Sequence, residues 1–238
     1  MKYQEALEYI DSLKKYGIVP GLDSIRELCR RLGDPQDRLQ FVHIAGTNGK
    51  GSVLAYVSTV LRCAGYRVGR YISPTVRDYR ERIQVNGRNI TQKALCGLVE
   101  ELRQACDSMV EDGLPHPTPF EVETVMGFLY FLRENCDLVV LETGMGGRED
   151  ATNVIRNTRV AVLASVSMDH MQYLGNSLAA IAEEKAGILK PGCLAVSMFQ
   201  EQEAMEVIRE KARRLQIPLT VADGREAKRV RYGLERQR

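Results

Sequence analysis

The sequence predicts an α/β fold with a mostly parallel central sheet and helices on both faces. From residue 137 onward, short runs rich in Val, Leu and Ile alternate with segments whose apolar residues recur at helical spacing. Earlier in the chain, a glycine-rich turn joins a buried strand to a helix. Strands separated by helices favour a parallel sheet whose strand carboxyl ends bind ligands.

The first 135 residues open with two helices and then alternate in the same way. Apolar spacing and caps predict helices over residues 3–13, 22–32, 50–63, 91–112 and 120–135. Strands are predicted over 40–45 and 67–72, and Asn86-Gly87 indicates a hairpin within 82–90. Thr91 can cap the helix that follows the hairpin. The apolar spacing in helix 50–63 comes from Val53, Tyr56, Val57, Val60 and Leu61.

The second half is predicted to alternate strictly. Short strands are expected over residues 137–142, 159–165, 192–198 and 218–221, and helices over 177–189 and 200–215. No internal repeat or low-complexity linker is visible, so one α/β domain over residues 1–221 fits best. Residues 222–238 form a divergent, locally basic tail, which we interpret as solvated.

Composition excludes several classes of protein. Lys and Arg total 33 against 31 Asp and Glu, which gives a net charge of +2. This charge is too small to indicate a nucleic-acid partner. No apolar run approaches the ~18 residues of a membrane span, and the N-terminus lacks a signal peptide's apolar centre. The six cysteines have no zinc-type spacing. We expect a cytoplasmic protein.

The stretch HIAGTNGKGS, residues 43–52, places three glycines, a lysine and a hydroxyl on a strand-to-helix turn. Glycines there let backbone N–H groups approach an anion at the helix N-terminus. Lys50 would neutralise the β and γ phosphates of a nucleotide, and Ser52 offers a hydroxyl to Mg²⁺. An ordinary glycine-rich turn is the alternative. The combination of strand, lysine, hydroxyl and helix favours a phosphate-binding loop.

Two further clusters follow predicted strands. Glu142 ends an apolar strand, where a nucleotide's metal would lie, although a carboxylate merely exposed at a strand end is the alternative. His170 follows the strand 159–165 and could ligate a metal or touch a phosphate. Lys185 lies beside apolar residues, and it could equally be a solvated helix charge paired with Glu183 or Glu184.

These segments together resemble the folylpolyglutamate synthase and dihydrofolate synthase family of Mur-type ligases. The resemblance runs in order from about residue 17 to 192, and its glycine loop has the family's form, with glycine between lysine and serine. The motifs that carry it are HIAGTNGKGS, ISPTVRDYRERIQVNG, TPFEVET, ETGMGGREDATNVI and SMDHMQYLG with IAEEKAGILKPG.

The resemblance implies an ATP- and Mg²⁺-dependent ligase of folate biosynthesis and one-carbon metabolism. The family transfers the γ-phosphoryl of ATP to a pterin substrate's carboxylate, and the amine of L-glutamate attacks the acyl phosphate. Its partners would be these small molecules, namely folate or dihydropteroate and L-glutamate, and we expect a monomer.

The family's site residues can be carried over to matching positions. Triphosphate binding is implied for Asn48, Gly49, Lys50, Gly51 and Ser52. One Mg²⁺ would be held by Ser52, Ser73 and Glu142, and a second by Glu142, His170 and a carbamylated Lys185. The catalytic set would be Lys50, His170 and Lys185. The pterin loop corresponds to Thr118 and Phe120, with Asp150 nearby.

The resemblance ends after about Val221, whereas family members continue into a smaller α/β domain that completes the ATP and glutamate sites. We therefore expect a fragment without the C-terminal glutamate-ligase domain and with little activity by itself. Two other functions stay open, namely another Mur-type amino-acid ligase and a non-catalytic nucleotide-binding remnant. The segments 72–87 and 118–124 favour the folate enzymes over the cell-wall ligases.

Overall fold

The computed structural model describes residues 1–168 and 177–223 and shows the α/β fold that the sequence predicts. Eight strands of these residues form one sheet in the order β4-β3-β2-β5-β1-β6-β7-β8. The strands are β1 (Phe41–Ala45), β2 (Val68–Tyr71), β3 (Ile83–Val85), β4 (Arg88–Asn89), β5 (Leu138–Glu142), β6 (Thr158–Leu163), β7 (Leu194–Met198) and β8 (Leu219–Ala222). The six strands β2-β5-β1-β6-β7-β8, in their order across the sheet, are all parallel to their neighbours. The pairs β2-β3 and β3-β4 at one edge are antiparallel.

The helices follow the predicted periodicity closely. The α-helices of the described residues are α1 (Tyr3–Ser12), α2 (Asp23–Arg31), α3 (Lys50–Cys63), α4 (Gln92–Glu111), α5 (Pro119–Arg133), α7 (Leu178–Lys185) and α8 (Gln202–Arg214). Short 3₁₀ turns are η1 (Leu13–Tyr16), η2 (Pro35–Arg38), η3 (Tyr79–Arg82), η4 (Ala151–Val154) and η5 (Ala186–Ile188). The predicted helix 177–189 is therefore shorter, because its last turn tightens into η5.

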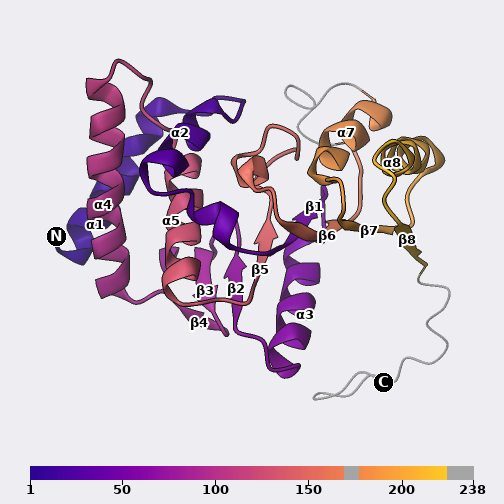
Figure 1. The fold of residues 1–238 in the computed structure, drawn as a ribbon, viewed down its shortest axis with the longest axis horizontal. Coiled ribbons are helices and arrows are strands. Elements are labelled where there is room, and N and C mark those ends of the chain that lie inside the picture. Colours follow the sequence, from indigo (N-terminus) through magenta and orange to yellow (C-terminus); the bar gives the residue numbers. More distant parts are fainter. Residues whose placement is uncertain (169–176, 224–238) are drawn as a thin grey trace.

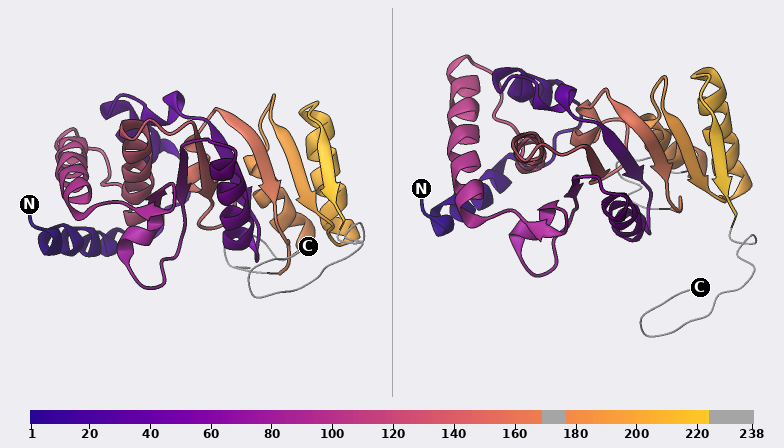
Figure 2. Two further views of the ribbon diagram at one scale, coloured as in Figure 1. Left: turned by 90° about the horizontal axis from the view of Figure 1, so that it is seen from below. Right: turned by 60° about the horizontal axis from the view of Figure 1, so that its bottom comes forward.

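Alternation along β1 assigns the helices to the two faces of the sheet. Phe41 packs with α2, α4 and α5 in the largest apolar cluster, and Ala45 packs with η5 and α8. Val42 and Ile44 point the other way, toward Leu54 of α3. Figure 1 shows α7 and α8 on one side of β6–β8 and α3 on the other, and Figure 2 shows α3 from below. Both faces are covered, as parallel sheets require.

Several local signals behave as their chemistry predicts. Asn86 and Gly87 both have positive φ, 50° and 79°, which is the backbone of a two-residue hairpin turn. The Thr91 hydroxyl accepts the N–H of Ala94 at the start of α4. The apolar spacing of α3 is only partly a core signal, because Tyr56 and Val60 are 69% and 66% exposed. Leu54, two residues before Tyr56, is the apolar side chain that α3 buries fully.

The sheet order places the predicted site segments side by side. Strands β2, β5, β1 and β6 are consecutive and parallel, so their carboxyl ends share one edge. Ser73 follows β2, Glu142 ends β5, and the glycine loop follows β1. None of the described helices is long and apolar enough to cross a bilayer.

Candidate active site

The glycine loop between β1 and α3 is held by the segment that follows β6. A side-chain carbon at Gly46 would lie 2.8 Å from Ala164 Cβ, so only glycine fits there. The Thr47 N–H donates to the Ser165 carbonyl at 2.7 Å. Gly49 has φ 84°, the left-handed region that favours glycine, and begins the turn into α3. The loop is therefore rigid in backbone terms, as an anion site needs.

The N-terminus of α3 is open for an anion. No described side chain caps this helix, and Ser52 in its first turn is exposed. The Lys50 ammonium lies over the loop and donates to the carbonyl of Gly46 at 3.0 Å. Unpaired N–H groups, the helix dipole and this cation together attract phosphate. The strand-to-helix turn that the sequence predicts is present at Asn48 to Ser52, and triphosphate binding there stays a prediction.

Glu142 lies beside this loop on the α3 face of the sheet. It pairs with Ile44 in the β1–β5 register, and its side chain is 6% exposed. A side-chain carbon at Gly51 would lie 3.8 Å from Glu142 Oε2. The alternative of a carboxylate exposed at a strand end is therefore wrong.

Burial raises the pKa of Glu142 to about 7, although the positive charges of Lys50 and Arg70 oppose that shift. The same burial lowers the pKa of Arg70, whose Nε has no hydrogen-bond partner in the described residues. This carboxylate is only weakly paired by protein cations. A divalent ion beside it would favour its charged form, so Glu142 fits the role of a Mg²⁺ ligand.

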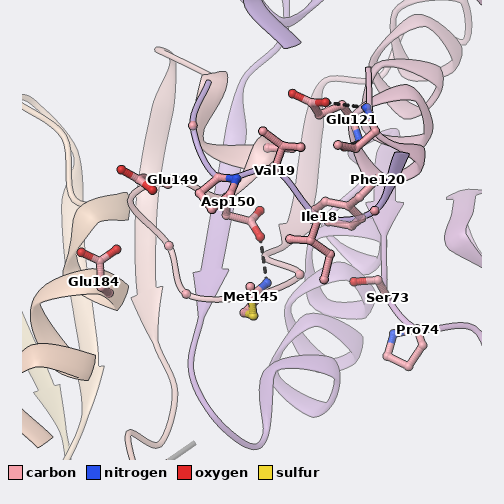
Figure 3. Close-up of a pocket in the computed structure, with 18 of the residues that line it drawn as sticks. Ile18, Val19, Ser73, Pro74, Phe120, Glu121, Met145, Glu149, Asp150 and Glu184 are labelled. Atoms are coloured by element: carbon pink, nitrogen blue, oxygen red, sulfur yellow. Dashed lines mark hydrogen bonds between the residues drawn. The ribbon is translucent and has the colours of Figure 1, made fainter. Parts of the chain in front are cut away.

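A cavity of about 410 Å³ opens next to this edge of the sheet. It is lined by four residues predicted for the site, namely Ser73, Thr118, Phe120 and Asp150. Figure 3 shows Ser73 and Phe120 on one side and the loop from Gly144 to Asp150 on the other. That loop follows Glu142 closely, and Glu142 itself lies beside Gly51, so one segment of chain leads from the glycine loop to the cavity.

The polar residues of the cavity are fixed by their own backbone contacts. Asp150 accepts from the N–H of Met145 at 2.8 Å and of Thr152 at 3.0 Å. Thr118 and Glu121 form a reciprocal capping box at the start of α5. Burial raises the pKa of both the Asp150 and Glu121 carboxyl groups. Asp150 therefore forms part of the cavity wall, and its carboxylate oxygens accept hydrogen bonds from the backbone of the loop.

The turn between η1 and α2 supplies a wall that the sequence reasoning missed. Ile18 and Val19 line the cavity and are 67% and 62% exposed. Arg82, Glu149 and Glu184 also line it and were not predicted. Two adjacent large apolar residues inside a glycine- and proline-flanked turn were the available signal, because such residues are seldom left in a surface turn without a contact to make.

Lys185 ends α7 and is 2% exposed. The alternative of a solvated helix charge is wrong, because the residue is buried. Glu183 and Glu184 pair with Arg148 at 2.6 and 3.6 Å. A side-chain carbon at Gly147 would lie 2.9 Å from the Lys185 carbonyl oxygen, so α7 packs directly against the cavity loop. His170 lies outside the described residues. Within the described ranges, no group of three His, Cys, Asp or Glu is arranged to hold a metal.

Gly187 should be essential to this packing. A side-chain carbon there would lie 2.5 Å from Arg148 Cα, a backbone atom that cannot rotate away. We expect Gly187→Ala to lower the free energy of unfolding by about 2–3 kcal/mol, measured by urea denaturation. Gly97→Ala is the matched control, because Gly97 lies within α4 with no atom within 4 Å and alanine there should stabilise by about 0.5–1 kcal/mol. Equal urea midpoints for the Gly187 variant and the parent would contradict the close contact.

Comparisons with known proteins agree with this geometry. The chain matches the Mur ligase middle domain over residues 44–234. It is 41% identical to the dihydrofolate synthase/folylpolyglutamate synthase of Bacillus subtilis, over 91% of this chain and 50% of that protein. It is 36% identical to the folylpolyglutamate synthase of Lacticaseibacillus casei, over 89% of this chain and 49% of that protein.

Solved structures show the same fold. A structure titled "FPGS-AMPPCP complex" superimposes with a TM-score of 0.88 at 34% identity, covering 93% of this chain and 54% of that chain. Another, titled "FPGS-AMPPCP-folate complex", has a TM-score of 0.86. The chain spans about half the length of the curated relatives it matches. It belongs to the Mur ligase middle-domain family, and the relatives described here are folylpolyglutamate and dihydrofolate synthases.

Proposed function

We propose that this chain provides the ATP-binding and acid-binding parts of an ATP-dependent acid–amino-acid ligase of the folylpolyglutamate/dihydrofolate synthase type. In this proposal, residues 1–221 are the ATP-binding domain. The observation that carries it is one continuous segment: Glu142 lies beside the glycine loop, and the residues that follow it line the 410 Å³ cavity. A nucleotide and a carboxylic acid bound at these two places would be neighbours.

The reaction needs that neighbourhood. An oxygen of the substrate carboxylate attacks the γ-phosphorus of ATP, the bond to the β-phosphate oxygen breaks, and ADP leaves. The amine of L-glutamate then attacks the acyl phosphate, an amide bond forms, and inorganic phosphate and a proton are released. Lys50 and the N–H groups at the start of α3 hold the triphosphate, and the cavity orients the acid.

Mg²⁺ fits the residues at this edge of the sheet. Glu142 is a buried carboxylate with a pKa raised to about 7, and the exposed Ser52 hydroxyl lies on the first turn of α3 beside it. Bound there with ATP, the ion would neutralise charge on the phosphates. We propose Ser52, Ser73 and Glu142 for one ion, and Glu142, His170 and a carbamylated Lys185 for a second. Lys185 is buried at the end of α7, beside the cavity loop, which supports this assignment.

The acid is proposed to be a pterin such as dihydropteroate or a reduced folate. Apolar surface from Ile18, Val19 and Phe120 suits a flat aromatic ring, and Ser73 and Asp150 add polar groups to the lining. A relative in the same fold carries folate in its title. The volume of about 410 Å³ is in the range of small-molecule sites.

Phe120 gives a direct test of the cavity. We expect Phe120→Ala to weaken dihydropteroate binding about tenfold or more, because a ring that lines the cavity is removed. Affinity for Mg·AMP-PCP, a non-hydrolysable ATP analogue, should not change. Phe199→Ala is the control, because the Phe199 ring is 63% exposed and outside the cavity lining. Equal weakening by both variants would contradict the placement of the acid.

The proposed substrate class is tested by calorimetric titration of the 238-residue chain. Dihydropteroate or tetrahydrofolate should bind in the presence of Mg·AMP-PCP, whereas muramyl precursors should not. Preferential binding of muramyl precursors would instead identify a cell-wall ligase. Binding of the nucleotide alone, with no acid of either class, would identify a nucleotide-binding remnant and overturn the ligase proposal.

A further inference from the structure

A histidine lies inside the sheet where every neighbour in the strand is apolar. His43 is the middle residue of β1, between β5 and β6, and its side chain has no solvent exposure. Burial, with the nearby positive charge of Lys190, lowers its pKa to about 3. The imidazole is therefore neutral near pH 7. It points to the same face as Phe41 and Ala45, where η4 lies.

The imidazole begins a chain of hydrogen bonds that ends in the cavity wall. His43 Nε2 lies 2.9 Å from the Thr152 hydroxyl, which itself donates to Asp150 Oδ1 at 2.5 Å. With Asp150 ionised, the Thr152 hydroxyl donates its one proton to that carboxylate and accepts from His43, so Nε2 carries the hydrogen. The other oxygen of Asp150 accepts the N–H of Met145 at 2.8 Å. Three buried side chains thus connect β1 to the backbone of the cavity loop.

We propose that His43 is a positioning residue for the acid-binding cavity: through Thr152 it fixes the Asp150 carboxylate and, with it, the loop from Gly144 to Asp150 that faces Phe120. The identity of the ligand in this proposal rests on the proposed function. His43 lies three residues before Gly46 in the sequence. Strand β1 therefore leads into the glycine loop and also carries the histidine that contacts the cavity loop through Thr152.

A role in packing alone explains the observations less well. His43 Nδ1 is buried and has no hydrogen-bond partner in the described residues. An apolar residue would avoid that unsatisfied atom in an otherwise apolar strand. What histidine provides at this position, and an apolar residue would not, is the Nε2–H group that contacts Thr152. Structural and positioning roles differ in a measurable way, because only the second links His43 to ligand affinity and to the Met145 amide.

The variants separate the donor from the volume. His43→Leu removes the Nε2–H group, and His43→Gln keeps an N–H donor at a similar distance from the backbone. Thr152→Val removes the hydroxyl with little change of shape, and Thr152→Ser retains it. All are made in the 238-residue chain. The probes are dihydropteroate and Mg·AMP-PCP, titrated by calorimetry, together with hydrogen exchange of the Met145 amide in the ligand-free protein.

We expect His43→Leu and Thr152→Val each to weaken dihydropteroate binding about tenfold and to leave Mg·AMP-PCP affinity unchanged. The double variant should be no weaker than either single one, because both remove the same connection. The Met145 amide should exchange at least about tenfold faster in the two variants. Gln at 43 and Ser at 152 should restore parental values.

Two results would overturn the inference. One is parental Met145 exchange in His43→Leu, whatever the ligands do. The other is a Gln variant as impaired as the Leu variant. If the parent binds no dihydropteroate but Met145 exchange still depends on His43, the proposed substrate is wrong and the positioning role stands. The two proposals therefore fail separately.

Discussion

Glu142→Gln should make the ligand-free protein more stable at pH 8 and remove its Mg²⁺-dependent nucleotide binding. The pKa of Glu142 is raised from 4.5 to about 7 by burial, so the native state resists its ionisation. The unfolded chain releases this proton first, and stability therefore falls as pH rises from about 4.5 to 7 and stays low above that range. Glutamine carries no charge and avoids the loss. We expect a gain of about 2–3 kcal/mol at pH 8 and almost none near pH 4.

Urea denaturation of parent and variant at the two pH values measures this difference. Glu111→Gln, at the exposed end of α4, is the control and should change neither stability nor binding. The same Glu142 variant should bind AMP-PCP equally with and without Mg²⁺, because the metal's carboxylate ligand is gone. A variant with parental stability at both pH values, or with parental Mg²⁺ dependence, would remove Glu142 from the site.

Lys50→Ala should weaken Mg·ATP binding at least about a hundredfold and leave the fold intact. Among the described residues, the ammonium donates to the carbonyls of Gly46 and Thr47 at 3.0 and 3.4 Å, and these belong to the surface loop, so its loss should open no cavity. A charge-assisted bond to phosphate contributes more than a neutral one, and Lys50 is the cation on this loop. Equilibrium dialysis with labelled ATP measures the affinity, and circular dichroism checks the fold.

Lys93→Ala provides the comparison for that measurement. Lys93 is an exposed lysine on α4. Figure 1 shows α4 well away from α3, where the glycine loop ends. Its replacement should leave ATP affinity at the parental value. If Lys50→Ala also retained parental affinity, the glycine loop would be an ordinary strand-to-helix turn.

The sheet and the strand-to-helix glycine turn could be predicted because their signals are local. Helix α3 begins at Lys50 and ends at Cys63, as its apolar spacing indicates. Thr91 caps the helix that starts at the next residue, and Asn86-Gly87 form the hairpin turn themselves, so both signals depend on near neighbours in sequence. Parallel strands also bring their carboxyl ends to one edge regardless of order along the chain, so Ser73 and Glu142 could be placed there.

Long-range packing decided what the sequence could not show. Lys185 follows two glutamates and resembles an ordinary helix charge in the sequence, but it is buried where α7 packs against the loop at Gly147. Ile18 and Val19 belong to the cavity because the η1–α2 turn reaches across to the loop after β5, a pairing of segments over 120 residues apart. His43 belongs to the predicted strand 40–45, and its role depends on Thr152, 109 residues further along the chain.

The proposal that this chain carries a nucleotide site built from the glycine loop and Glu142 is tested most directly by one calorimetric titration. Mg·AMP-PCP is titrated into the 238-residue protein at pH 8, with a parallel titration of AMP-PCP in the presence of a chelator. We expect saturable binding with one site per chain in Mg²⁺ and binding at least about tenfold weaker without it. Absence of binding under both conditions, or equal affinity with and without the metal, would contradict the nucleotide site.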